Sequence, residues 1–179
     1  MKQVTVRAFC GMKNNFTYGE ITSVGMNQLL GYIKEDFPDL KGNFLDIGSG
    51  YARLVTFMAE QTKMNCVGVE INPEMHNNAL KTIWTNAHSR MKLLCDDIVN
   101  LPGIVESADV IYMNCVTWDP KLVSRIFQQA NGIMYHNCVR AIRLDDGKLW
   151  DYPGEPAPLN CSWGIEDQKY YKLNTKTVR

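Results

Sequence analysis

The segment FLDIGSGYARLV at residues 44–55 constrains the fold of this chain more than any other stretch. Apolar residues run into Asp46, Gly48 and Gly50 follow with one residue between them, and the apolar pattern then resumes. Because glycine has no Cβ, this spacing predicts a tight turn from a strand into a helix, with a backbone that a ligand can approach closely. We therefore expect a binding site at the end of this strand.

Strands and helices are expected to alternate after about residue 41, which indicates an α/β protein. Short apolar runs predict the strands, and runs with helical spacing predict the helices between them. Such alternation implies a parallel sheet with helices on both faces. The expected strands lie at residues 43–48, 65–71, 91–97, 109–114 and 132–139, and the expected helices at 52–61, 73–90 and 119–130.

The two ends of the chain are expected to add a helix and an antiparallel pair of strands. Residues 22–37 have a helical pattern, which Thr22 or Ser23 can cap. Near the other end, residues 161–164 and 169–175 flank a polar turn and predict a hairpin that closes the sheet. A Rossmann-like parallel sheet with an antiparallel last hairpin is the outline of class I methyltransferases, so the sequence predicts that fold.

Composition and charge argue against several kinds of partner. The 19 lysines and arginines balance 19 aspartates and glutamates, so no global charge attracts the chain to nucleic acid or to a membrane. No apolar run is long enough to span a bilayer, and the first ten residues lack the pattern of a signal peptide. The six cysteines are scattered and the three histidines have no ligand-like spacing, so we expect reduced thiols and no metal site.

Three acids stand at the ends of successive predicted strands, and they indicate the kind of ligand. A dinucleotide site prefers a third glycine where this chain has Arg53, and Asp46 would repel a pyrophosphate. A cationic ligand fits Asp46 better, which favours S-adenosylmethionine with its sulfonium and ammonium groups. Glu70 can accept both ribose hydroxyls. Asp97 can accept from the adenine amino group while Ile98 packs on the ring.

Alternatives stay open at this point. Asp96 competes with Asp97 for the adenine. A dinucleotide is compatible with Glu70, because dinucleotide sites also use a strand-end acid for the ribose. The glycine turn could also connect a strand to a helix without binding any ligand.

Several motifs together resemble the disruptor-of-telomeric-silencing (Dot-one) family of histone-lysine methyltransferases, which lack a SET domain. The resemblance covers roughly residues 16–175. It implies a chromatin enzyme that methylates a lysine in the globular core of the H-three type histone, using S-adenosylmethionine and releasing S-adenosylhomocysteine. The motifs are YGEITSVGMNQLL at 18–30, FLDIGSGYARLV at 44–55, VGVE at 67–70, IYMNCVTWDP at 111–120 and CSWGIEDQKYYKLNT at 161–175.

The resemblance also implies a domain organisation and individual residue roles. A loop and helix at residues 1–40 would cover the cofactor, and residues 41–179 would form the catalytic domain of a single globular unit. The implied cofactor site consists of Tyr18, Glu20, Asp46, Gly48, Gly50, Glu70, Asp97 and Ile98; Tyr112, Trp118, Trp163 and Tyr170 would line a lysine channel, with Asn114 beside the transferring methyl group.

An aromatic channel suits the chemistry of lysine methylation. Lysine has an ordinary pKa of about 10.4, whereas the transfer requires the neutral amine. A narrow aromatic channel removes water from the ammonium group and lowers its pKa, and the ring faces attract the cation. Asn114 could orient the amine with its amide oxygen, and no strong general base is expected. Each aromatic residue could instead belong to the core.

The sequence also bears on substrates and functions other than histone methylation. The Asn/Asp-Pro-Pro-aromatic box of base methylation is replaced here by MNCVTWDP, which disfavours nucleic-acid bases. A non-histone protein, a small amine, or an inactive cofactor-binding paralogue are the alternatives. A nucleosome is the implied substrate, but the few basic residues near the predicted hairpin indicate only weak intrinsic binding to DNA. The resemblance implies the nucleus, or the cytoplasm if the substrate is not a histone.

Overall fold

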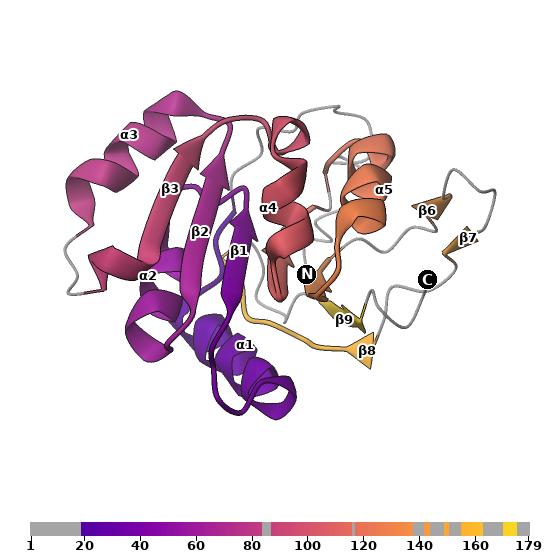
Figure 1. The fold of residues 1–179 in the computed structure, drawn as a ribbon, viewed down its shortest axis with the longest axis horizontal. Coiled ribbons are helices and arrows are strands. Elements are labelled where there is room, and N and C mark those ends of the chain that lie inside the picture. The colour runs from indigo at the N-terminus through magenta and orange to yellow at the C-terminus, as the bar shows by residue number, and fades with distance from the viewer. Residues whose placement is uncertain are drawn as a thin grey trace, which may run out of the picture.

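One seven-stranded sheet forms the centre of the molecule, with the order β3-β2-β1-β4-β5-β9-β8 (Figure 1). The computed structural model describes residues 19–83, 87–115, 117–137, 142–143, 149–150, 155–162 and 170–174. Strands β1 to β5 are parallel, β9 is antiparallel to β5, and β8 is antiparallel to β9. The strands are β1 Asn43–Ile47, β2 Asn65–Glu70, β3 Met91–Cys95, β4 Val110–Met113, β5 Ile133–His136, β8 Glu155–Pro156 and β9 Tyr171–Asn174. The predicted Rossmann-like sheet with antiparallel C-terminal strands is confirmed.

Helices pack on both faces of the sheet, as the alternating pattern predicted. One core contains buried side chains of α1, α2 and α3 together with Phe44, Cys66 and Tyr112. The other contains those of α4 and α5 together with Leu45 and Ile111. Neighbouring residues of one strand belong to different cores because successive side chains of a strand point to opposite faces. The helices are α1 Ser23–Asp36, α2 Arg53–Gln61, α3 Pro73–Thr82, α4 Pro102–Ser107 and α5 Pro120–Gln129, with 3₁₀ turns η2 His88–Arg90 and η3 Ile98–Asn100.

Helix ends follow local signals in the sequence. Thr22 caps α1, and its side chain accepts a hydrogen bond from the backbone N–H of Gly25 at 3.2 Å. The predicted helix at residues 73–90 is too long, because α3 ends at Thr82 and Ile83 has an extended backbone. β-branched residues have reduced helix propensity, and two stand in succession there. Helix α4 was not predicted; it is only six residues long, too short for a clear periodic pattern.

The C-terminal hairpin is only partly as predicted. Strand β9 closes the sheet as expected, but β8, and not residues 161–162, pairs with its outer edge. Cys161 instead forms an antiparallel bridge with Ile21, and the Thr22 N–H donates to the Asn160 carbonyl at 3.0 Å. The chain before α1 therefore occupies the backbone groups that the predicted hairpin would have used.

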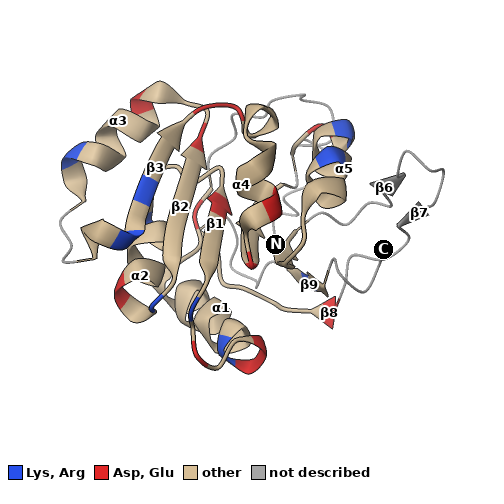
Figure 2. Cartoon of the chain, in the orientation of Figure 1, with Lys and Arg blue, Asp and Glu red and all other residues tan. Residues whose placement is uncertain are grey.

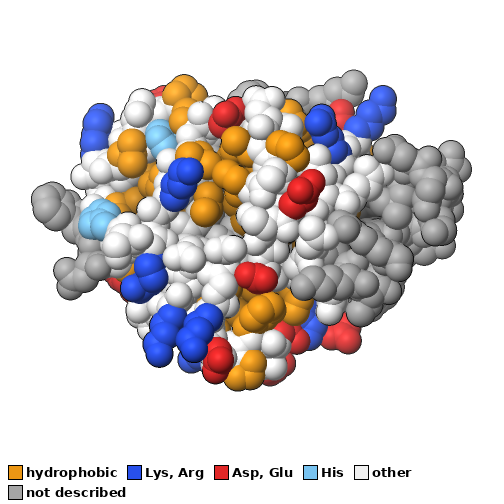
Figure 3. Space-filling view, in the orientation of Figure 1, with side chains coloured by type: hydrophobic (Ala, Val, Ile, Leu, Met, Phe, Trp, Pro, Cys, Tyr) orange, Lys and Arg blue, Asp and Glu red, His pale blue; other side chains and the backbone are white. Residues whose placement is uncertain are grey.

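The edge strand β3 is less buried than the central strands. Leu93 and Leu94 are half-buried, and Figure 3 shows apolar side chains at the surface over β2 and β3. A separate small hairpin pairs β6 Ile142–Arg143 with β7 Leu149–Trp150. Within the described ranges, no helix is both long and apolar enough to cross a membrane.

Candidate active site

A cleft opens along the carboxyl ends of the parallel strands. Gly48, Glu70, Asp97 and Asn114, which end or follow β1, β2, β3 and β4, all line its larger hollow. The larger hollow has an empty volume of about 830 Å³, part of it open to solvent, and a smaller hollow beside it reaches Asp46. Figure 2 shows acidic residues gathered along this edge of the sheet.

The turn after β1 has the conformation that its glycines predicted. Gly48 and Gly50 have φ angles of +79° and +54°, a region that residues with a side chain rarely adopt. The N–H groups of Gly48 and Ser49 both donate to the Val69 carbonyl, at 2.8 and 3.1 Å. A Cβ on Gly48 would lie 3.2 Å from Cζ2 of Trp118. Glycine therefore keeps the floor of the cleft open at this position.

Glu70 ties this turn to the end of β2. Its Oε2 accepts from the Gly50 N–H and its Oε1 from the Asn72 N–H, both at 2.8 Å. Each carboxylate oxygen can accept a further hydrogen bond, so these two bonds are compatible with ribose binding. The predicted ribose contact stays a prediction, but the structural role of Glu70 in shaping the turn is plain.

Asp46 is buried in β1 with its side chain at the smaller hollow. Burial raises its pKa from the ordinary 3.8 to about 8, and the negative charge of Glu70 adds to this effect. A carboxylate in such surroundings is costly to ionise unless a positive charge joins it. The ammonium and sulfonium groups of S-adenosylmethionine supply that charge, so the residues present fit this cofactor.

The loop after β3 contains both candidates for the adenine contact. Asp97 caps η3, and its Oδ1 accepts from the Val99 N–H at 3.1 Å. Asp96 Oδ1 accepts from the Asp97 N–H and from Nδ2 of Asn100. Both acids are half-buried and line the larger hollow, while Ile98 beside them is buried. The choice between Asp96 and Asp97 stays open, and an apolar surface for a ring is present.

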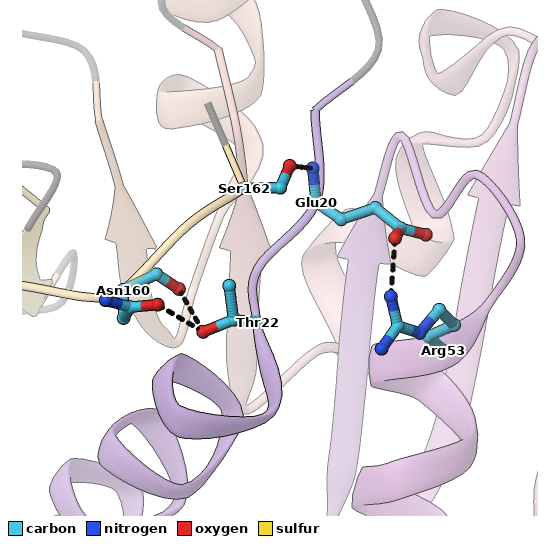
Figure 4. A network of polar contacts seen from close by, with 5 residues as sticks. All are labelled: Glu20, Thr22, Arg53, Asn160 and Ser162. Atoms are coloured by element: carbon cyan, nitrogen blue, oxygen red, sulfur yellow. Dashed lines mark hydrogen bonds and ion pairs between the residues drawn. The ribbon is translucent and has the colours of Figure 1, made fainter. Parts of the chain in front are cut away.

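Glu20 lies at the smaller hollow and is held from two sides (Figure 4). Its Oε2 accepts from Nη1 of Arg53 at 2.6 Å, and its N–H donates to Oγ of Ser162 at 3.1 Å. Arg53, the residue at the position of the missing third glycine, thus lines the smaller hollow together with Glu20. Tyr18, the other residue of the predicted covering loop, lies outside the described residues.

Asn114 is half-buried beside Gly48 and lines both hollows. Its Oδ1 accepts a hydrogen bond from Nδ2 of Asn137, and the Oδ1 of Asn137 accepts from the Cys115 N–H at 2.6 Å. Sequence reasoning missed Asn137. The signal was available, because Asn114 and Asn137 each follow directly after neighbouring strands.

The predicted lysine channel needs correction. Tyr170 is almost completely buried, its hydroxyl lies 2.7 Å from that of Tyr112, and the two rings stack with centroids 5.5 Å apart. Tyr170 therefore belongs to the core and cannot line an open passage. Tyr112 lines the smaller hollow from that core, and Trp118 lines the larger hollow. Trp163 lies outside the described residues.

Two further expectations concern metal and thiols. Among the residues that the structure describes, no group of His, Cys, Asp or Glu side chains is arranged to hold a metal ion. The described cysteines, Cys66, Cys95, Cys115 and Cys161, are reduced.

Comparison with known proteins supports the fold assignment. No curated protein sequence matches the chain. A protein from Methanococcus maripaludis described as an S-adenosylmethionine-dependent methyltransferase has a TM-score of 0.53 at 24% identity, over 64% of this chain and 54% of that protein. An RNA methyltransferase from Salinibacter ruber, in complex with S-adenosylhomocysteine, has a TM-score of 0.57 at 18% identity, over 86% and 93%. A methyltransferase from Geobacter sulfurreducens has a TM-score of 0.53 at 15% identity, over 72% and 54%.

At these identities the likeness concerns the fold, and it confirms the class I methyltransferase architecture. The chain spans about half of the length of the M. maripaludis and G. sulfurreducens proteins, 54% of each.

Residues 44–135, just over half of the chain, match the methyltransferase domain family. This region contains most of β1, all of β2 to β4, most of β5, the glycine turn and the acids Asp46, Glu70, Asp96 and Asp97. The match is to a broad family and does not single out the Dot-one family or a histone substrate. It does confirm the predicted cofactor, S-adenosylmethionine. This chain therefore belongs to the methyltransferase domain family.

Proposed function

We propose that the chain methylates a nitrogen atom of an amine. The proposal rests on one observation: neither of the two acids that line the smaller hollow around Asn114 is available as a general base. Glu20 is paired with Arg53, and Asp46 is buried where the positive charge of the cofactor belongs. Neither is placed to take a proton from the methyl acceptor in that state. The acceptor must therefore be nucleophilic without first losing a proton, as a neutral amine is and an alcohol is not.

The cofactor contacts of the proposed enzyme come from three strand ends. When bound, S-adenosylmethionine supplies an electrophilic methyl group on a sulfonium. Asp46 would balance its positive charge, Glu70 would accept the ribose hydroxyls, and Asp97 with Ile98 would hold the adenine. Asn114, between the two hollows, would lie beside the transferred group. In-line transfer requires the amine about 3 Å from the methyl carbon, so positioning is the main task of these residues.

The acceptor proposed here is a small amine or an exposed protein lysine. The core position of Tyr170 removes one wall of the channel that a histone core lysine would need. The narrower proposal, a histone-lysine methyltransferase of the Dot-one type with the nucleosome as substrate, rests on the motif resemblance. A nuclear location belongs to that narrower proposal alone.

The test is methyl transfer from labelled S-adenosylmethionine to a panel of acceptors. The panel contains primary and secondary amines, unfolded and folded lysine-containing proteins, free histones, nucleosomes and transfer RNA, and mass spectrometry locates the methyl group. N-methylation of an amine or lysine supports the proposal, and methylation of a histone lysine in nucleosomes would support the narrower histone proposal. Transfer only to oxygen, carbon or RNA would contradict it. The exposed Asp39→Asn variant serves as a positive control, and Asp46→Asn as a variant impaired in cofactor binding.

A further inference from the structure

Asn137 lies behind a residue of the cleft without entering the cleft itself. Strands β4 and β5 are parallel with Met113 opposite His136, so the next residues, Asn114 and Asn137, are also neighbours. Asn137 is 3% exposed, whereas Asn114 is half-buried and lines both hollows. A buried amide at the end of a strand needs partners for its oxygen and its nitrogen. Both partners of Asn137 belong to the segment that follows β4.

One backbone group sets the orientation of both side-chain amides. The Cys115 N–H can only donate, so the Asn137 atom that lies 2.6 Å from it must be the acceptor Oδ1. The Asn137 Nδ2 then points the other way and needs an acceptor, which is the Oδ1 of Asn114. The identity of oxygen and nitrogen in both amides therefore follows from chemistry and does not depend on an arbitrary assignment.

The consequence concerns what Asn114 offers to a ligand. Its oxygen is engaged by Asn137, while its Nδ2 carries two N–H groups on the other side of the amide. Gly19, Gly48 and Asn114 are the described residues that line both hollows, so Asn114 lies where the two parts of the cleft meet. The sequence had suggested the opposite polarity, with the amide oxygen facing the amine.

We propose that Asn137 is a positioning residue that fixes the Asn114 amide so that its N–H groups, and not its oxygen, meet an acceptor atom of the ligand at this junction. The inference rests on the proposed function of the cleft. It assigns Asn137 no contact with cofactor or substrate. Asn137 can therefore affect binding or turnover only by way of Asn114. Substitutions of the two residues should then have effects that do not add.

The first experiment is a double-mutant cycle of Asn137→Asp and Asn114→Ala. Aspartate keeps an acceptor for the Cys115 N–H but, when ionised, cannot donate to Asn114. We measure the affinity for S-adenosylhomocysteine by calorimetry, and kcat and KM separately. We expect Asn114→Ala to impair the affinity, kcat or KM at least tenfold. Asn137→Asp should impair the same quantity by a similar factor. The double variant should be no more impaired than either single variant. Independent, multiplying effects would overturn the proposal.

A matched control is present on the opposite edge of the sheet. Asn65 donates from Nδ2 to Oδ1 of Asn43 at 3.4 Å in an exposed amide pair at the amino ends of β2 and β1. Asn65→Asp makes the same chemical change away from the cleft, and it should alter neither affinity nor kcat. An equal loss in Asn65→Asp and Asn137→Asp would assign the effect to general destabilisation and overturn the positioning role.

The polarity of Asn114 has its own tests. Asn114→Asp replaces the N–H donors with an acceptor, so it should behave like Asn114→Ala; wild-type behaviour would overturn the proposal.

In the wild-type protein, the side-chain NH₂ resonance of Asn114 should shift when S-adenosylhomocysteine is added, and a resonance that does not move would contradict the donor role. This measurement needs no variant to fold. Failure to methylate any amine would reject the proposed function, yet the amide resonances would still decide this inference.

Discussion

Replacing Asp46 with asparagine should stabilise the ligand-free protein while preventing cofactor binding. Burial, and secondly the charge of Glu70, raise the pKa of Asp46 from 3.8 to about 8. Between about pH 4 and pH 8, the folded protein therefore holds a proton on Asp46 that the unfolded chain has already released. Stability from this proton is fully present below pH 4 and is lost as the pH rises toward 8. Asparagine resembles the protonated carboxyl group and is not subject to this loss.

The size of the effect follows from the pKa. The interval from 3.8 to about 8 spans about four pH units, and each contributes about 1.4 kcal/mol, so the full difference is on the order of 6 kcal/mol. Between pH 5 and pH 8 the advantage of Asp46→Asn should grow by about 4 kcal/mol. Binding should show the complementary effect. The affinity of the wild type for S-adenosylmethionine should rise as the pH approaches 8, because the ligand requires the ionised carboxylate.

Urea denaturation of both ligand-free proteins at pH 5 and pH 8 measures the difference. Asp39→Asn is the control, because the Asp39 side chain is 84% exposed and its replacement should give no pH-dependent gain. Calorimetry with S-adenosylmethionine at pH 8 should show at least a hundredfold loss of affinity for Asp46→Asn. A stability difference that is the same at pH 5 and pH 8 would refute the reasoning, since Asp46 would then ionise in the folded protein as easily as in the unfolded chain.

Three other variants separate the shape of the cleft from its chemistry. Gly48→Ala should lower the free energy of unfolding, measured in urea, by about 1–2 kcal/mol, because Gly48 has a positive φ angle and lies near the Trp118 ring. It should also weaken binding of S-adenosylhomocysteine, and unchanged stability would contradict this prediction. Glu70→Gln should cost about 1–3 kcal/mol by the same measurement, because an amide cannot accept on both sides. Tyr170→Phe should cost about 1 kcal/mol by losing the hydroxyl pair with Tyr112. Its KM and kcat for a methyl acceptor should stay within twofold, and a large loss would return Tyr170 to the predicted channel.

The acids of the cleft could be predicted because they depend on topology alone. Once β1, β2 and β3 are recognised as parallel strands, their carboxyl ends must meet at one edge of the sheet. Asp46, Glu70 and Asp97 then come together whatever the details of packing, and the structure has them lining one cleft. The glycine spacing likewise determines the turn, since Gly48 and Gly50 both have positive φ angles.

The aromatic residues could not be placed in the same way. A tyrosine suits a core and a cation channel equally well, because its ring is apolar and its hydroxyl needs one partner in either setting. For Tyr170 the decision comes from tertiary packing, where the ring stacks on Tyr112 and the hydroxyl finds a partner inside the protein. The pairing of Ile21 with Cys161 was equally out of reach, since it joins residues far apart in sequence and without strand patterning.

The two buried acids at the glycine turn perform different tasks, and the difference lies in their hydrogen bonds. Glu70 receives a backbone N–H on each oxygen, and these two hydrogen bonds shape the turn. Asp46 lies one strand away in a drier place, where burial makes its ionisation unfavourable. Asp46 is therefore the acid whose ionisation depends most on a bound cation. A cation that binds there removes the cost of its ionisation, which couples cofactor binding to the release of a proton and to a gain in stability above pH 4.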